Sequence, residues 1–347
     1  MSRVVNVKNI AIGGGNRVSI QSMTNTPTAD VQRTSEQIQK LANAGCDIVR
    51  LAVSSEQEIE ACKRYIKEFD IPLVADIQFD YRLAVKCSEI GFSKVRINPG
   101  NIGSEQCVKK VVDACKANGT VIRVGVNGGS LEGGIALEGA DALAVSALKS
   151  VELVSKYGFD DIVISVKSSD VKTMIQANRI IASRCDYPLH LGVTESGDVS
   201  DGTLKSAIGI GSLLCDGIGD TIRVSLSGDP INEVIAARNI LRSIRLDKSF
   251  CEIVSCPTCS RCSYDLESVV KEIKQFTKDV TDPLKVAIMG CVVNGPGEAK
   301  NADFGVAGGK DKAVIFAKGE IIKTIEQKEI VTELKNLITK FLMEKKN

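Results

Sequence analysis

The chain has 347 residues, of which 44% are hydrophobic, and its 44 Lys and Arg against 43 Asp and Glu leave a net charge of +1. The hydrophobic share excludes a disordered chain, and the balanced charge excludes a strongly basic nucleic-acid binder. Tryptophan is absent and aromatic residues make up only 4%, which argues against stacking platforms for single-stranded nucleic acid.

Residues 1–245 alternate short β-branched runs with amphipathic stretches of helical period. Eight strands are predicted, at Ser19–Met23, Asp47–Val53, Leu73–Ile77, Lys94–Asn98, Val121–Val126, Asp161–Val166, Leu189–Val193 and Thr221–Ser225. The clearest helical patterns between and after them lie at Asp30–Ala44, Glu56–Glu68, Ser104–Ala117, Asp141–Lys156, Asp170–Ser183 and Ile231–Ile244.

Eight such units, spaced by about 28 residues, predict an α/β fold, a (β/α)8 barrel of TIM type. The main alternative is a doubly wound sheet. It is disfavoured because no G-x-G-x-x-G motif lies between the first strand and the first helix. The three glycines Gly13, Gly14 and Gly15 precede the first barrel strand, so a tight turn is expected there rather than a phosphate loop.

Residues 246–347 are predicted to form a smaller α+β domain. Its expected elements are a helix at Leu266–Lys278, strands at Lys285–Met289, Phe304–Ala307, Ala313–Ala317 and Ile321–Ile325, and a final helix at Val331–Glu344. A charge-rich junction, Arg245–Cys251, precedes it, and a glycine-rich loop runs through Gly297.

Cationic residues recur at the C-terminal ends of the expected strands, where active sites of such barrels lie. The five cations are Arg50, Arg96, Arg123, Lys167 and Arg223, with Asn98, Asn127 and Ser225 as their uncharged polar neighbours. Gathering five cations on one rim is costly unless an anion binds there. The alternative is that some pair with acids or point outward between the helices. We expect a ligand with more than one negative charge, and a diphosphate fits because guanidinium groups match phosphate oxygens.

Two acids, Asp76 and Glu195, are expected on the same rim. Either could handle protons during a reaction, or both could simply balance the cationic charge. His190 is the only histidine of the chain. It lies at the start of its predicted strand, away from the rim, and is expected to be structural.

Twelve cysteines are many for a chain in which no secretory segment and no long apolar run is evident. We therefore expect a cytoplasmic protein with reduced thiols, most of them packed as small hydrophobic side chains. Five lie in the last third, at Cys251, Cys256, Cys259, Cys262 and Cys291. The C-x2-C-x2-C run with a distant fourth cysteine favours an iron–sulfur cluster over zinc, and spacing alone nominates Cys262 as a ligand.

Five motifs occur in order along the chain: QSMTNT at 21–26, RINPGN at 96–101, GVTE at 192–195, CPTC at 256–259 and CVVNGPGE at 291–298. Together they resemble the bacterial (E)-4-hydroxy-3-methylbut-2-enyl diphosphate synthases, the IspG or GcpE family. The resemblance implies a barrel followed by a smaller iron–sulfur domain. It also implies the reductive ring opening and dehydration of 2-C-methyl-D-erythritol 2,4-cyclodiphosphate in the non-mevalonate (MEP) isoprenoid pathway. The electron donor would be flavodoxin or ferredoxin. The assembly would be a homodimer in which the cluster domain of one subunit covers the barrel of the other.

The resemblance also assigns roles to residues. The ligands of a [4Fe–4S] cluster would be Cys256, Cys259, Cys291 and Glu298, with Cys262 not a ligand. A carboxylate such as Glu298 is a weaker ligand than a thiolate, so its departure would open one iron to the substrate. Glu195 would be the acid near the reacting carbons, and Gln78 stands where the family commonly carries histidine. The substrate-binding residues would be Arg50, Arg96, Arg123, Asn127, Lys167 and Ser225, with Asp76 beside them.

Two other functions stay open from the residues alone. One is a barrel lyase or aldolase acting on a phosphorylated sugar, with Lys167 as a Schiff base and a structural metal module at the tail. The other is an electron carrier that uses the barrel as a docking scaffold. The polar ring argues against the carrier because such a ring has no purpose without a ligand.

Overall fold

The computed structural model describes residues 1–128, 137–291, 300–309 and 311–345. The chain divides into two units, Met1–Leu246 and Asp247–Asn347. Each unit has its own hydrophobic core, so each is described by itself. Among the described residues no helix is both long enough and apolar enough to cross a lipid bilayer.

Eight parallel strands form the centre of the first unit. They are β3 (Ser19–Met23), β4 (Ile48–Ala52), β5 (Leu73–Asp76), β6 (Lys94–Ile97), β7 (Val121–Asn127), β8 (Ile162–Lys167), β9 (His190–Leu191) and β10 (Thr221–Ile222). They pair in the order β8-β7-β6-β5-β4-β3-β10-β9. A parallel bridge between Ile164 and Leu189 joins the two ends of this sheet. The predicted barrel is therefore confirmed, and the doubly wound alternative is wrong.

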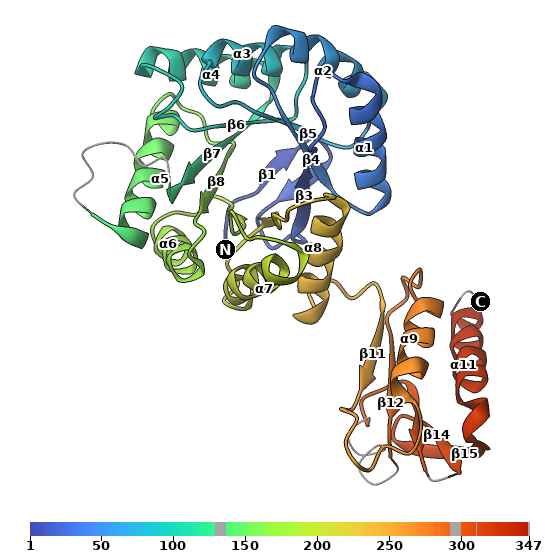
Figure 1. Ribbon diagram of the computed structural model, residues 1–347. Helices are drawn as coiled ribbons and strands as arrows, with labels where there is room; N and C mark the ends of the chain where they lie inside the picture. The colour runs from blue at the N-terminus through green and yellow to red at the C-terminus, as the bar shows by residue number, and fades with distance from the viewer. Residues whose placement is uncertain (129–136, 292–299, 310, 346–347) are drawn as a thin grey trace. The chain divides into compact units, whose positions relative to one another are not determined.

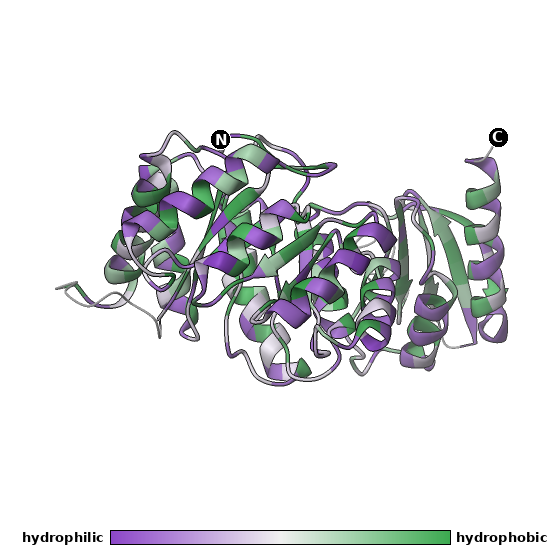
Figure 2. Cartoon of the chain, turned by 90° about the horizontal axis from the view of Figure 1, so that it is seen from above, coloured by the Kyte–Doolittle hydropathy of each residue, from purple (hydrophilic) through white to green (hydrophobic). Residues whose placement is uncertain are grey.

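Helices surround these strands (Figure 1). They are α1 (Val31–Asn43), α2 (Glu56–Glu68), α3 (Tyr81–Glu89), α4 (Glu105–Asn118), α5 (Gly139–Ser155), α6 (Val171–Arg184), α7 (Val199–Cys215) and α8 (Ile231–Ser243). Many begin at a capping side chain that accepts a backbone N–H of the first turn, as Ser55 does for α2 and Asp170 for α6. Hydrophilic and hydrophobic residues alternate along the helices, whereas the strands are mainly hydrophobic (Figure 2).

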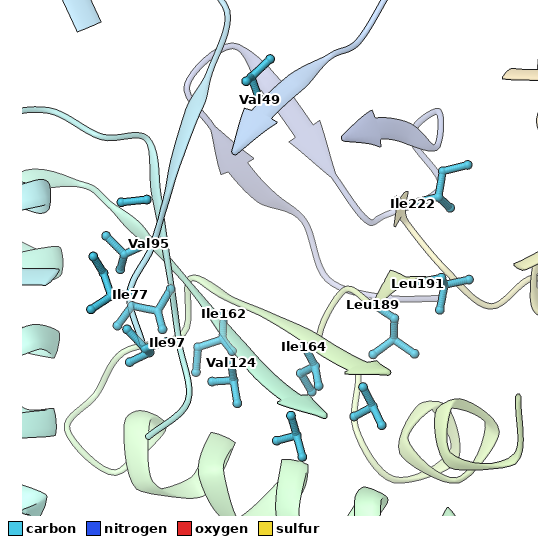
Figure 3. Packing of buried hydrophobic residues seen from close by; sticks show 14 of the residues in the cluster. Val49, Ile77, Val95, Ile97, Val124, Ile162, Ile164, Leu189, Leu191 and Ile222 are labelled. Carbon is cyan, nitrogen blue, oxygen red and sulfur yellow. The ribbon is translucent and has the colours of Figure 1, made fainter. Parts of the chain in front are cut away.

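The two faces of the barrel strands have different compositions because successive side chains point to opposite sides. The outward side chains are apolar and pack beneath the helices, as Val49, Val95 and Val124 do (Figure 3). The inward side chains include most of the charged residues of the strands. The hydrophobic core of this unit therefore lies between strands and helices, and the barrel interior is left for polar groups.

A short antiparallel hairpin, β1 (Val5–Val7) and β2 (Ile10–Ile12), closes the N-terminal end of the barrel. Our sequence analysis did not predict it. The turn that follows at Gly13–Gly15 has three glycines with positive φ, as the expected tight turn requires. The apolar plug consists of Val5, Val7 and Ile12 packed with Ile48, Val74, Val121 and Val163 from the first residues of four strands.

The described residues of the second unit form a five-stranded mixed sheet packed with helices. Its elements are β11 (Cys251–Ser255), α9 (Leu266–Phe276), β12 (Leu284–Met289), β13 (Phe304–Gly308), β14 (Lys312–Ala317), β15 (Glu320–Glu326), a 3-10 turn (Gln327–Glu329) and α11 (Ile330–Glu344). The strands lie in sequence order, with β11, β12 and β13 parallel and the last two antiparallel. This confirms the predicted α+β domain and adds β11, which begins at the last residue of the expected junction and was not predicted.

Candidate active site and cluster site

Register brings the expected rim residues together on the inner face of the barrel. Asp76 of β5 lies beside Arg96 of β6, and Arg96 lies beside Arg123 of β7. Arg50 of β4 and Lys167 of β8 share this inner face. All five side chains are buried, with Arg50 the most exposed at 9% and Arg123 the least at 1%. The structure thus places five of the predicted substrate-binding residues around one interior space.

Asp76 is the acid at the centre of this group. Its Oδ1 lies 3.2 Å from Nη1 of Arg96, and its Oδ2 lies 3.7 Å from Nε of Arg50. Burial alone would raise the pKa of the Asp76 carboxyl, but the charges of Arg50, Arg96 and Arg123 outweigh it and lower that pKa below its ordinary value. Asp76 is therefore ionised at neutral pH, which suits it to orient guanidinium groups rather than to carry protons.

The second buried acid of this site is Glu233, which our sequence analysis did not identify. It lies in the first turn of α8, is 3% exposed, and pairs with Arg223 through Nη2–Oε1 at 2.8 Å and Nε–Oε2 at 3.1 Å. The Ser22 hydroxyl and the Leu226 N–H also donate to it. We expected Asp76 and Glu195 to be the acids available to balance the ring, but the counter-charge of Arg223 is Glu233. Glu233 shares the buried face of α8 with Ala237 and Ile240, and that spacing was the available signal.

The cations of the site outnumber these two carboxylates, and within the described residues Arg123 and Lys167 form no ion pair. Burial, together with the charges of Arg223 and Arg96, lowers the pKa of Arg50 to about 10 even though Asp76 opposes the shift. Burial is also the main reason why the pKa of Lys167 is far below its ordinary value, and Arg223 and Arg50 add to it. The site therefore holds more positive than negative charge in a dry interior, which an anionic ligand would relieve.

Two glycines leave room for these cations. A Cβ added at Gly125 of β7 would lie 2.4 Å from Nε of Arg96, and one added at Gly192 would lie 2.9 Å from Nζ of Lys167. Arg96 also donates to the carbonyl oxygen of Gly125 through Nη2. At both positions the cationic side chain occupies the space that the Cβ of any other residue would need.

The other expected site residues lie in the loops at the same end of the barrel. The Ser225 hydroxyl accepts from Nη1 of Arg223 at 2.5 Å, and Asn127 is the last residue of β7, beside Lys167. Gln78 is exposed. Glu195 is exposed too and has a positive φ of 52°, a conformation that costs energy for a residue with a side chain. Glu195 makes no hydrogen bond or ion pair within the described part of the chain, so it is available to a ligand.

The cysteines of the second unit gather where two neighbouring parallel strands end. Cys256 follows β11 and Cys291 lies two residues after β12, and these strands pair as far as Ser255 and Ile288. The Sγ of Cys256 accepts the backbone N–H of Gly290 at 3.1 Å. A Cβ added at Gly290 would lie 2.7 Å from the Sγ of Cys262. Cys256 and Cys262 therefore lie against Gly290, and Cys291 is the next residue in the chain.

Cys259 lies in an exposed turn after Cys256. Hydrogen bonds from the backbone and the side chain of Arg261 lower the pKa of its thiol, which favours the thiolate that metals bind. Within the described residues no three Cys, His, Asp or Glu side chains are close enough to hold a single metal ion. A [4Fe–4S] cluster differs because each thiolate binds its own iron. Glu298, the expected fourth ligand, lies outside the described residues.

Cys262 instead donates its thiol to the carbonyl oxygen of Tyr264 at 3.3 Å. This contact gives Cys262 a role in packing the cysteine loop.

The comparisons with known proteins agree along the whole chain. The GcpE TIM-barrel domain matches residues 2–238, and the GcpE protein C-terminal domain matches residues 252–340. A 4-hydroxy-3-methylbut-2-en-1-yl diphosphate synthase (flavodoxin) of Caldanaerobacter subterraneus subsp. tengcongensis is 53% identical over 99% of this chain and 98% of its own length. The synthase of the same name from Clostridium perfringens is 52% identical over 97% of this chain and 98% of its own length.

Solved structures of other enzymes are similar to part of this chain. A type I 3-dehydroquinate dehydratase from Clostridium difficile aligns with a TM-score of 0.53 at 16% identity, over 70% of this chain and 98% of that one. A dihydropteroate synthase from Xanthomonas albilineans aligns with a TM-score of 0.52 at 12% identity, over 70% of this chain and 99% of that one. At such identities the likeness establishes the fold only. The two domain matches and the full-length relatives establish more: the chain belongs to the GcpE family.

Proposed function

We propose that the chain catalyses the reaction for which its relatives are named, the synthesis of 4-hydroxy-3-methylbut-2-en-1-yl diphosphate. The chain is an oxidoreductase of the MEP pathway. Its substrate is 2-C-methyl-D-erythritol 2,4-cyclodiphosphate, which is opened and dehydrated with two electrons. The relatives' names support this function and give no support to a lyase or to an electron carrier.

The observation that carries the proposal is the charge excess inside the barrel. Arg50, Arg96, Arg123 and Lys167 are each at least nine-tenths buried, and within the described residues only Arg50 and Arg96 of these four pair with a carboxylate, that of Asp76. Buried cations without counter-ions are costly, so this interior is suited to a ligand that brings several negative charges. Guanidinium groups and an ammonium are the donors that bind phosphate oxygens well. Asn127 and Ser225 at the same end add neutral donors, and these six residues are our proposed diphosphate ligands.

The second unit supplies the proposed cluster site. Cys256, Cys259 and Cys291 would hold a [4Fe–4S] cluster with Glu298 as a fourth, exchangeable ligand. When bound, this group supplies the electrons that the ring opening consumes. The donor set suits it because Cys256 and Cys291 follow neighbouring strands and the hydrogen bonds of Arg261 lower the pKa of the Cys259 thiol.

Glu195 is our proposed catalytic acid. It lies at the rim, exposed and without a partner, and its backbone has a positive φ of 52°. Strain of this kind is often retained where function needs a side chain in one place. Glu195 would hold or release a proton at the carbons that are reduced.

Flavodoxin is the proposed electron donor, with ferredoxin as the alternative. The assembly we propose is a homodimer in which the second unit of one subunit covers the barrel of the other. Helix α7 supports it with two exposed apolar residues one turn apart, Leu204 at 63% and Ile208 at 50%. A cytoplasmic location fits the twelve cysteines, all of which are free.

Substitution of one ring cation tests the substrate assignment. Lys167→Ala removes a charge-assisted contact worth roughly 1.5–3 kcal/mol. We expect the KM for the cyclodiphosphate to rise by about ten- to a hundredfold, while the visible spectrum of the cluster stays unchanged. Lys86→Ala, on the outside of the barrel, is the matched control. Unaltered KM and kcat in the Lys167 variant would contradict the anion-binding role of the ring.

A further inference from the structure

A lysine that the proposed reaction does not use lies below the cationic ring. Lys94 is two residues before Arg96 on β6, so both side chains point into the barrel, with Lys94 about 7 Å deeper. Its strand neighbours are Val74 and Val121, two residues of the apolar plug. Lys94 is 0% exposed. Side chains alternate between the two faces of a strand, so the predicted strand at 94–98 could have placed Lys94 on the same face as Arg96.

Among the residues that the structure describes, no carboxylate forms an ion pair with the amine of Lys94. Its Nζ makes no hydrogen bond within the described part of the chain, and the same holds for Nε2 of His190 and both amide atoms of Gln21. The two buried carboxylates are bound elsewhere, Asp76 by Arg50 and Arg96, and Glu233 by Arg223. A buried ammonium without a partner is strongly unfavourable, and such a group loses its proton instead.

The charged groups that face Lys94 also favour loss of its proton. Burial, and after it the charges of Arg123 and Arg50, place the pKa of Lys94 well below its ordinary value. His190 faces the same cations, and burial with Arg123, Lys167 and Lys94 also lowers its pKa well below the usual range. His190 therefore stays neutral and offers no negative charge. Only an anion brought from outside can stabilise a proton on Lys94.

We propose that Lys94 is a proton-uptake site coupled to the substrate: its amine is uncharged in the free barrel and takes one proton from solvent when the cyclic diphosphate binds to the ring above it. The inference rests on the proposed function. The step forms one N–H bond at Nζ, with buffer as the proton source and no change in oxidation state. The ligand cannot supply the proton, because each phosphorus of a cyclic diphosphate carries a single, strongly acidic oxygen. The pKa of Lys167 is lowered too, but Lys167 lies at the rim and is 7% exposed. The variant Lys94→Met leaves Lys167 intact, so it assigns the proton to one lysine or the other.

Calorimetry measures this proton directly. The cluster-loaded protein, kept oxidised and without a donor so that no turnover occurs, is titrated with the cyclodiphosphate near pH 8 in buffers of different ionisation enthalpy. The slope of binding heat against ionisation enthalpy gives the protons taken up. We expect about one proton for the wild type, and an association constant that falls by up to tenfold for each unit of rising pH. Lys94→Met should lose most of the uptake and flatten that pH profile.

Controls separate the possible failures. Lys86→Met, an exposed lysine of α3 paired with Glu56, should keep the wild-type uptake. Lys94→Met should fold with an equal or higher melting temperature, because an apolar side chain of similar length replaces an unpaired buried amine. If the wild type binds the cyclodiphosphate without taking up a proton, the inference is overturned, even if no variant folds. Full proton uptake by a folded Lys94→Met variant overturns it as well. If the wild type does not bind the cyclodiphosphate at all, the proposed function itself fails.

Discussion

At the level of single residues, two buried carboxylates orient the guanidinium groups of the barrel. Asp76 contacts Arg50 and Arg96, whereas Glu233 binds Arg223 through two nitrogens. Arg223 in turn donates to Ser225. These contacts connect Glu233 to Ser225 through Arg223. A residue of helix α8 therefore orients Ser225, one of the residues that we propose to bind the substrate.

This arrangement predicts that Glu233→Gln damages both stability and substrate binding. The variant leaves the buried charge of Arg223 without a counter-ion, which costs on the order of 3 kcal/mol. Chemical denaturation would measure this loss, and the KM for the cyclodiphosphate should rise because Ser225 is no longer held. Glu89→Gln, on an exposed surface of the barrel, should stay within about 0.5 kcal/mol of the wild type. Wild-type stability and KM in Glu233→Gln would show that the pair orients nothing.

The sequence was sufficient to predict the ring cations but not their partners. Arg50, Arg96 and Arg123 interrupt β-branched strands, so they are visible as exceptions to a pattern, and Lys167 directly follows the predicted strand Asp161–Val166. Glu233 is one acid in an amphipathic helix and becomes distinctive only when the fold turns it inward. The exposed position and positive φ of Glu195 also depend on the loop after β9, which has no pattern in the sequence.

At the level of elements, the β strands act as a scaffold whose glycines make room for charge. Gly125 of β7 lies against Nε of Arg96, which itself contacts Asp76. The strand pattern predicted all eight barrel strands, but it overestimated β9 and β10, which have only two residues each. The hairpin β1–β2 was missed because each strand has three residues, too few to show a period.

Gly125→Ala tests whether Arg96 needs the space that Gly125 leaves beside its guanidinium group. The added Cβ would lie 2.4 Å from Nε of Arg96, so the guanidinium must shift and its contact with Asp76 is weakened. We expect the KM for the cyclodiphosphate to rise by roughly tenfold, the loss of one charge-assisted contact, with the cluster spectrum unchanged. Gly211→Ala in α7 is a suitable control, since a Cβ there meets nothing within 4 Å. Steady-state kinetics identical to wild type in Gly125→Ala would mean that Arg96 does not need its present position.

At the level of the whole molecule, the first unit holds the buried cations and the second unit holds the cysteine motif. The cysteine motif and the strand ends agree on where a cluster would be held. The spacing of the motif could not separate Cys262 from the proposed ligands, because the C-x2-C-x2-C run repeats the same interval before Cys259 and before Cys262.

Serine variants of the cysteines distinguish the ligands. Cys262→Ser should retain the cluster absorbance and the iron content after anaerobic purification, since its thiol only donates to a backbone oxygen. Cys256→Ser should lose both, because a serine hydroxyl is a poor substitute for a thiolate ligand. A colourless Cys262→Ser together with a brown Cys256→Ser would reverse our assignment.

The central claim is that charge in the barrel and thiols in the second unit serve one reductive reaction. The most direct test is to incubate the anaerobically purified, cluster-loaded protein with reduced flavodoxin and 2-C-methyl-D-erythritol 2,4-cyclodiphosphate, and to analyse the products by mass spectrometry. We predict that 4-hydroxy-3-methylbut-2-enyl diphosphate forms with the oxidation of two flavodoxin equivalents per product. Unchanged cyclodiphosphate in the presence of an intact, reducible cluster would contradict the account.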